Sequence, residues 1–156
     1  MRLHVDAVGR HRAGPEAAMV ADYLARTART GRGVGLSGAT LTEVEARKPA
    51  TPAREADALR RAIPEGATLV ALDERGRTMT SPAFAERIAG WRDGGVRDAV
   101  FAIGGADGLD PDLRAGAALA VSFGPMVWPH LLARVMLAEQ LYRAAAILAG
   151  APYHRQ

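Results

Sequence analysis

The chain has 156 residues, and 49% of them are hydrophobic, so it can bury the core of one folded domain spanning residues 1–156. Its 20 basic and 17 acidic side chains leave a net charge of +3, which permits nucleic-acid binding without requiring it. The absence of cysteine excludes disulfides, thiolate zinc sites and cysteine nucleophiles. Charges interrupt every apolar run well below the length of a bilayer span, and the first eight residues are too short and polar for a signal peptide. We therefore expect a cytoplasmic protein without a membrane partner.

Strand and helix patterns alternate through the first half of the chain. Short alternating or apolar runs indicate strands, whereas proline at a first turn and apolar residues at helical spacing indicate helices. The predicted elements are a strand at 2–8, a helix at 15–28, a glycine-rich loop at 31–38, a weak strand at 40–46 and a helix at 53–63.

The second half continues the alternation with more strongly apolar strands. Ser81 and Pro82 indicate a capped helix start, and two glycines end that helix. The predicted elements are strands at 68–72, 99–103 and 119–123, and helices at 81–93, 111–117 and 129–148.

This alternation predicts an α/β fold with a mostly parallel sheet flanked by helices. In such sheets, ligands bind beyond the carboxyl ends of the strands. Three predicted strand ends, at 72–73, 103–105 and 123–124, fall in the second half of the chain. We therefore expect the functional site to be built mainly from that half.

Three loop motifs leave alternatives open. Residues 33–38 match a dinucleotide-binding glycine pattern, but they follow a helix and precede a strand, which favours a flexible loop. Gly104 and Gly105 follow a buried strand, so they either let a ligand or another backbone segment approach closely or form an ordinary tight turn. The apolar loop 123–128 is either packed core or the wall of a pocket for a flat apolar group.

The last helix and the tail carry the polar candidates. His130 and Arg134 are four residues apart, as are Glu139 and Arg143, so each pair shares a helix face, which is either functional or simply solvated. The tail ends in Tyr153, His154 and Arg155, residue types that stack on bases and bind phosphates but that also fray at termini. The four histidines lack ligand spacing, so no metal site is expected, and no serine-hydrolase elbow is present.

Taken in order, these segments resemble a known family. The pattern includes Leu72-Asp73-x-x-Gly76, Ile103-Gly104-Gly105-x-x-Gly108-Leu109, Pro129-His130, Arg134-x4-Glu139-x2-Tyr142-Arg143 and the terminal Tyr153-His154-Arg155. It is similar to the ribosomal large subunit methyltransferase H family, bacterial SPOUT-class enzymes that methylate N3 of a pseudouridine in 23S rRNA. The likeness spans the whole chain and is weakest between about residues 30 and 64.

The resemblance implies a SPOUT-type α/β knot, in which the C-terminal segment forms a trefoil knot at the interface of a homodimer. It also implies an S-adenosyl-L-methionine cofactor. The residues implied to bind it are Leu72, Gly104, Phe123, Gly124, Pro125, Met126, Val127 and Trp128. The loop departs from the family because Pro125 has no N–H to donate to adenine and Val127 has no hydroxyl.

The resemblance further implies roles for the last helix and the tail, with the ribosome and its 23S rRNA as partner. The implied catalytic residues are His130, Glu139, Arg143 and His154, and the implied RNA-binding residues are Arg134, Tyr142, Tyr153, His154 and Arg155. Two alternatives stay open at this point: a SPOUT-type methyltransferase acting on tRNA or another rRNA site, and a non-catalytic ribosome-binding module.

Overall fold

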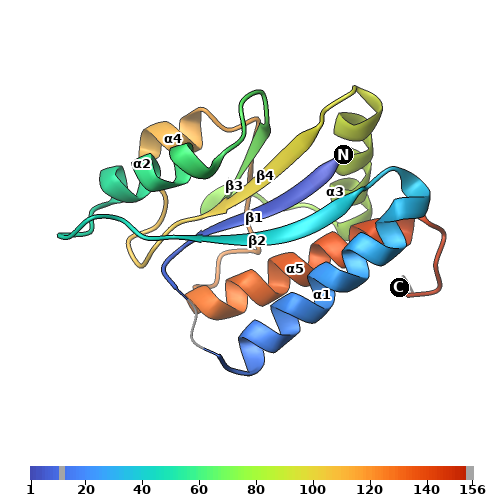
Figure 1. The fold of residues 1–156 in the computed structure, drawn as a ribbon, viewed down its shortest axis with the longest axis horizontal. Coiled ribbons are helices and arrows are strands. Elements are labelled where there is room, and N and C mark those ends of the chain that lie inside the picture. Colours follow the sequence, from blue (N-terminus) through green and yellow to red (C-terminus); the bar gives the residue numbers. More distant parts are fainter. Residues whose placement is uncertain (11–12, 154–156) are drawn as a thin grey trace.

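A computed structural model describes residues 1–10 and 13–153 of the chain (Figure 1). Its elements are β1 (Arg2–Val8), α1 (Pro15–Gly31), the 3-10 helix η1 (Arg32–Val34), β2 (Gly38–Val44), α2 (Pro52–Ala62), β3 (Thr68–Arg77), α3 (Ser81–Asp93), β4 (Asp98–Ile103), α4 (Pro111–Ala115), β5 (Leu119–Val121) and α5 (His130–Leu148). All the predicted strands and helices are present, with their ends shifted by a few residues.

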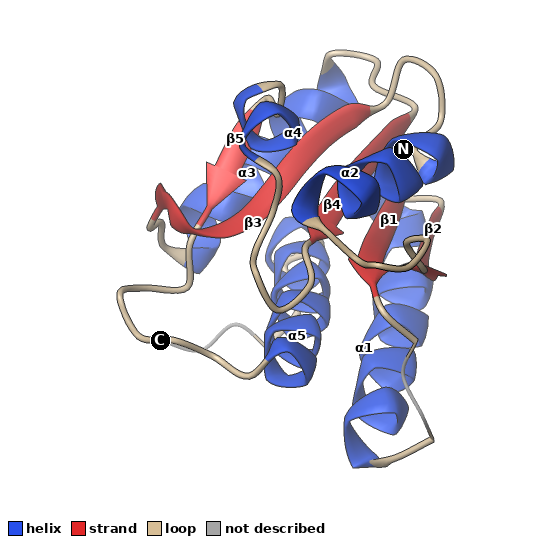
Figure 2. Ribbon diagram, turned by 90° about the vertical axis from the view of Figure 1, so that its left-hand side faces the viewer, coloured by secondary structure: helices blue, strands red, loops and turns tan. Residues whose placement is uncertain are grey.

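The five strands form one sheet in the order β2-β1-β4-β3-β5, and every pairing within it is parallel. The predicted α/β class with a parallel sheet flanked by helices is therefore confirmed. Parallel strands all end at the same edge of a sheet, so the loops after β1, β3, β4 and β5 gather there. Figure 2 views the sheet from the side on which the strands end.

Helices cover both faces of the sheet, and each layer has its own core. One core joins α1, α3 and α5 to inward-facing residues of the strands, with Phe101 and Leu141 among its fully buried members. The other joins α2 and α4 to the opposite face through Leu59, Ala71 and Leu113. Figure 1 shows α2 and α4 on one side of the strands, and α1 and α5 on the other. Burial on both faces explains why β4 consists entirely of buried residues.

The helix starts follow local chemistry closely. Helices α1 to α4 each have proline in the first turn, where its missing N–H leaves no hydrogen bond unmade. The predicted cap of α3 is corrected by one residue, because Thr80, not Ser81, accepts the hydrogen bond from the Ala83 N–H. The Ser81 hydroxyl instead donates to Gln140 of α5 at 2.8 Å. Ser81 therefore links α3 to α5.

Strand β3 is longer than the apolar run 68–72 predicts. After an irregularity that follows Leu72, the chain pairs again with β5 at Arg77, whose carbonyl accepts a hydrogen bond from Ser122 N–H. Gly76 allows this return: a Cβ there would lie 2.6 Å from the backbone of Val121. The polar segment predicted as a plain loop is therefore held against β5.

A charged cluster lies at the opposite, amino-terminal edge. Arg2 binds both carboxylate oxygens of Asp98, at 2.7 and 2.8 Å, and His4 Nε2 lies 2.7 Å from the same side chain. The hydrogen bond from Arg2 lowers the pKa of Asp98 to about 2, against the opposing effect of burial. On β1, the strand that carries Arg2 and His4, burial raises the pKa of Asp6, whose Oδ2 atom has no hydrogen-bond partner.

Within the described part of the chain, no helix is long and apolar enough to cross a membrane. The same residues contain no group of three or more histidine, aspartate or glutamate side chains arranged to hold a metal ion.

Candidate functional site

A cavity of about 470 Å³ lies beyond the carboxyl ends of β3, β4 and β5. Its walls come from four segments: the turn after Leu72, the loop 103–109, the loop 121–128 and the start of α5. This volume falls in the range typical of small-molecule sites. The cavity therefore occupies the position at which ligands bind in parallel α/β sheets.

Glycine backbone forms one wall of the cavity. A Cβ on Gly104 would lie 2.5 Å from the backbone of Gly108, and Gly108 itself has a φ of +80°. The loop thus folds back on itself so tightly that no side chain fits at position 104. Gly108 N–H also donates to the Gly105 carbonyl at 3.1 Å, so the tight turn and the close backbone approach occur together in this loop.

The turn after β3 forms a second wall and is held by charge. The Asp73 carboxylate, 6% exposed, pairs with Arg114 of α4 at 3.2 Å and accepts a hydrogen bond from Arg75 N–H at 2.9 Å. Because one carboxylate binds both its own turn and α4, the polar residues 73–75 keep a defined position at the cavity.

Seven of the eight predicted cofactor-binding residues line this cavity. They are Leu72, Gly104, Phe123, Gly124, Met126, Val127 and Trp128. The exception is Pro125, which is exposed and does not line the cavity. Because Pro125 does not line the cavity, its missing N–H removes no donor from the wall.

His130 is the predicted catalytic residue that reaches the cavity. It is the first residue of α5, and its Nε2 atom lies 2.6 Å from the Gly104 carbonyl oxygen. A carbonyl can only accept a hydrogen bond, so Nε2 carries the hydrogen and donates it. The imidazole is thereby tied to the glycine wall.

Arg134 does not fit its predicted role in RNA contact. Its side chain is 2% exposed, and its guanidinium donates to Glu43 and to the carbonyls of Val8 and Gly9, each at 2.7 Å. Burial lowers the pKa of Arg134, while the hydrogen bond that its guanidinium donates to Glu43 opposes the shift. A guanidinium enclosed in this way joins α5 to the ends of β1 and β2 and presents no donor to a phosphate.

The remaining predicted residues of α5 form a separate cluster with the tail. The Glu139 carboxylate accepts hydrogen bonds from Arg143 Nε at 2.9 Å and from the Tyr153 hydroxyl at 3.0 Å. The ring centroids of Tyr153 and Tyr142 are 4.5 Å apart, and the Arg143 Cζ atom lies over the Tyr153 ring, 5.0 Å from its centroid. Burial raises the pKa of Tyr153 to about 12. The side chains that the motif groups together therefore do meet in space.

Within one chain, the Glu139 cluster and the cavity lie at different positions along α5. A helix rises about 1.5 Å per residue, so Glu139 lies about 13 Å along α5 from His130, and Arg143 about 20 Å. Figure 1 shows α5 beginning below the carboxyl ends of the strands. His154 and Arg155, predicted for catalysis and RNA binding, lie outside the described residues.

Some residues near the cavity had no individual signal in the sequence. Glu55 of α2 accepts a hydrogen bond from the Gly105 N–H at 3.2 Å, although it lies 50 residues away in the chain. Asp73 and Asp107 also line the cavity. Only the position of Asp73 directly after a predicted strand pointed to it.

Similarity to known proteins shows the class to which this chain belongs. The family model described as "Predicted SPOUT methyltransferase" matches residues 1–154, and the chain belongs to that family. It is 64% identical over 155 residues to a protein of Dinoroseobacter shibae named "Ribosomal RNA large subunit methyltransferase H", with 99% of each chain covered. A protein of the same name from Paracoccus denitrificans is 62% identical over 156 residues, the full length of both. The predicted family resemblance is confirmed.

Among solved structures, the chain is similar to the SpoU methyltransferase AviRb from Streptomyces viridochromogenes, determined in complex with AdoMet. The two are 15% identical with a TM-score of 0.41, and the match covers 92% of this chain and 57% of the other.

Proposed function

We propose that this protein transfers a methyl group from S-adenosyl-L-methionine to N3 of a pseudouridine in 23S rRNA, on the assembled ribosome. The observation that carries the proposal is the glycine-walled cavity beyond β3, β4 and β5. It belongs to a chain whose full-length relatives bear the name ribosomal RNA large subunit methyltransferase H. The protein would be a single domain in the cytoplasm, where its ribosomal substrate is found.

The residues around the cavity suit this cofactor. Phe123 and Trp128 offer apolar surface for adenine, and the backbone near Gly104 and Gly124 offers polar groups without obstructing side chains. The Asp73 carboxylate provides a negative charge near a ligand that carries a sulfonium. When bound, the cofactor supplies the electrophilic methyl group.

The chain's own residues would position the base and help its N3–H lose a proton. An N–H flanked by two carbonyls is moderately acidic, so a nearby cation stabilises the anion without requiring a strong base. Arg143 is the cationic candidate and Glu139 orients it, while His130 is placed at the cavity by its hydrogen bond to Gly104. In this proposal Tyr153, His154 and Arg155 contact the RNA, and the Tyr142 ring packs against that of Tyr153.

A homodimer would bring the two groups of residues together. One subunit's Glu139 cluster would then face the partner's cavity, since the two are separated along α5 within a chain. Large exposed apolar side chains support such an interface: Met126, Val127, Trp128, Leu131 and Leu132 are each at least 37% exposed. We also propose the trefoil knot of this family, which membership of the SPOUT methyltransferase family supports.

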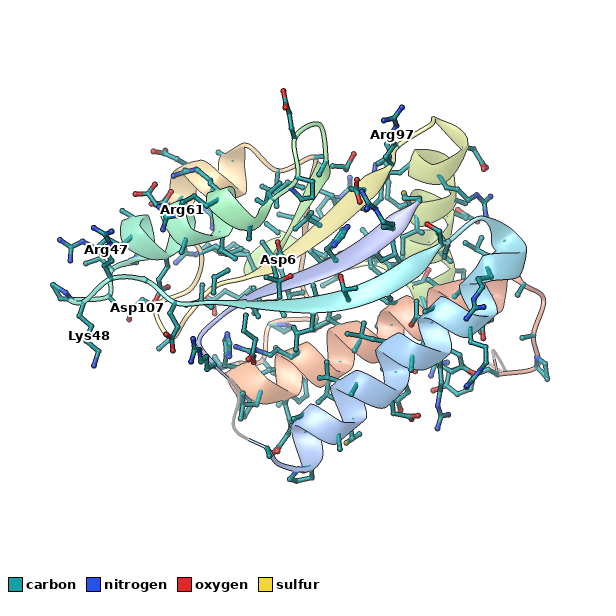
Figure 3. The ribbon with its side chains drawn as sticks, in the orientation of Figure 1. Asp6, Arg47, Lys48, Arg61, Arg97 and Asp107 are labelled. Atoms are coloured by element: carbon teal, nitrogen blue, oxygen red, sulfur yellow. The ribbon has the colours of Figure 1, made fainter. Side chains whose placement is uncertain are left out.

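A group of exposed basic side chains near the carboxyl edge of the sheet supports RNA binding. Arg47, Lys48 and Arg61 are exposed, and Figure 3 shows them at the end of the molecule that also carries Asp107. Arg97 is labelled at the other end.

Substitution of two of these residues tests the surface. We expect the paired substitution Arg47→Gln and Lys48→Gln to make the RNA affinity depend less steeply on salt concentration, by an amount that corresponds to about two lost phosphate contacts. Arg97→Gln is the matched control. An unchanged salt slope in the paired variant would exclude this surface.

Mass spectrometry of rRNA tests the proposal directly. Ribosomes from a strain lacking the gene should acquire N3-methylpseudouridine when incubated with the pure protein and S-adenosylmethionine. Methylation of tRNA or of another rRNA nucleotide would favour the first alternative function. No measurable binding of S-adenosylmethionine by calorimetry would favour a non-catalytic ribosome-binding module.

Deletion of residues 153–156 tests the role of the tail. We expect the shortened protein to bind S-adenosylmethionine normally and to lose methylation, because Tyr153, the described residue of this segment, does not line the cavity. Full methylation by the shortened protein would contradict the roles assigned to Tyr153, His154 and Arg155.

A further inference from the structure

A single peptide group at the cavity is held from both sides. The Gly104 carbonyl and the Gly105 N–H belong to the same planar peptide and point in opposite directions. The carbonyl accepts the hydrogen bond from His130 Nε2 at 2.6 Å, and the N–H donates to Glu55 Oε2 at 3.2 Å. Helices α2 and α5, on opposite faces of the sheet, are thus connected through this one peptide.

Glu55 fits closely against this peptide. A Cβ on Gly105 would lie 2.6 Å from the Glu55 Oε1 atom, so the carboxylate occupies the space that a side chain would need. Glu55 is partly buried, whereas Asp57 on the next part of α2 is exposed and pairs with Arg60. A carboxylate drawn out of water towards a backbone N–H makes a stronger hydrogen bond than two neutral groups would.

We propose that Glu55 is a positioning residue for cofactor binding. Its carboxylate fixes the orientation of the Gly104–Gly105 peptide, and through the Gly104 carbonyl it sets the position of the His130 imidazole. A negative acceptor on the N–H side polarises the amide and strengthens the carbonyl as an acceptor for His130. This inference rests on the proposed function, because it assigns Glu55 to the cavity that holds S-adenosylmethionine.

Calorimetry with S-adenosylmethionine tests the role of Glu55. We expect Glu55→Ala to weaken cofactor binding about tenfold, the effect of losing one hydrogen bond to a charged group. Glu55→Gln keeps an oxygen that accepts from Gly105 N–H, so its affinity should stay within about threefold of the wild type. Asp57→Ala removes a carboxylate from the same helix and should bind the cofactor normally.

A second measurement needs no cofactor. In the free protein, the amide proton of Gly105 should shift upfield and exchange faster with solvent in Glu55→Ala, and it should stay protected in Glu55→Gln. Glu55→Asp keeps the charge on α2 but is one methylene shorter, so it should behave like the alanine variant. This variant also serves if Glu55→Ala fails to fold.

The outcomes separate this inference from the proposed function. If the wild-type protein does not bind S-adenosylmethionine, the proposed function fails. If it does bind, wild-type affinity in Glu55→Ala or Glu55→Asp overturns the inference. An equal loss in Asp57→Ala overturns it as well, because the effect would then come from the helix rather than from Glu55.

Discussion

Substitution of Arg134 by methionine removes the guanidinium while keeping most of the aliphatic stem. It therefore distinguishes a buried structural role from contact with RNA. The guanidinium donates three hydrogen bonds of 2.7 Å, one to the Glu43 carboxylate and two to backbone carbonyls. Its loss leaves a partly buried carboxylate and two carbonyls with fewer donors, which costs energy in a site that water reaches poorly.

The expected loss of stability is about 4 kcal/mol, since breaking one side of a buried ion pair costs about 3–5 kcal/mol. The free energy of unfolding of a domain is about 5–15 kcal/mol, so this change is a large fraction of the total. With a denaturant slope of about 2 kcal/mol/M, the urea midpoint should fall by about 2 M. Arg97→Met, at an exposed arginine, should shift the midpoint very little.

RNA binding by the folded variant tests the alternative, in which Arg134 contacts RNA. If Arg134 acts inside the protein, Arg134→Met should bind RNA with an unchanged salt dependence at low urea and low temperature. The reasoning is refuted by a variant that unfolds at the same urea concentration as the wild type and whose RNA affinity depends less steeply on salt concentration, by an amount that corresponds to about one lost phosphate contact.

Three further changes test the cavity, the charged cluster and the tail. Gly104→Ala should abolish cofactor binding in calorimetry, because its Cβ would meet backbone at 2.5 Å; Gly90→Ala, on the exposed side of α3, should bind normally. Asp98 has a lowered pKa when folded, so its stabilisation is present above about pH 4 and disappears as the pH falls towards 2. Asp98→Asn should therefore lower the free energy of unfolding measured in urea by about 1 kcal/mol at pH 7, a loss kept small by solvent screening at the exposed Arg2. The difference from the wild type should vanish near pH 2. Tyr153→Phe removes the hydroxyl that donates to Glu139, so methylation measured under single-turnover conditions should slow while the melting temperature changes by a few degrees at most.

Local patterns in the sequence were enough for the elements and for their class. Proline in first turns and apolar runs between them predict the alternation of strands and helices, because these signals depend only on neighbouring residues. The parallel sheet follows, since such an alternation buries both faces of the strands. The same reasoning located the cavity, because parallel strands end together and Gly104 follows one of them.

Local patterns cannot predict contacts between residues that are distant in the sequence. Helical spacing pairs His130 with Arg134, yet the structure directs His130 to the cavity and buries Arg134 against β1 and β2. Glu55 reaches Gly105 across 50 residues, and no local feature marks it. These outcomes depend on which face of each helix meets the sheet, and that choice is settled by the packing of the whole core.

The sequence by itself determined the order of elements, the edge of the sheet where the cavity lies, and the family to which the chain belongs. Only the tertiary structure decided which motif residues meet. It separated the Glu139 cluster from the cavity along α5 and excluded Pro125 from the wall. The physical reason is that a motif records the order of residues along the chain, whereas a site depends on distances set by folding. One helix 19 residues long holds its two ends about 27 Å apart.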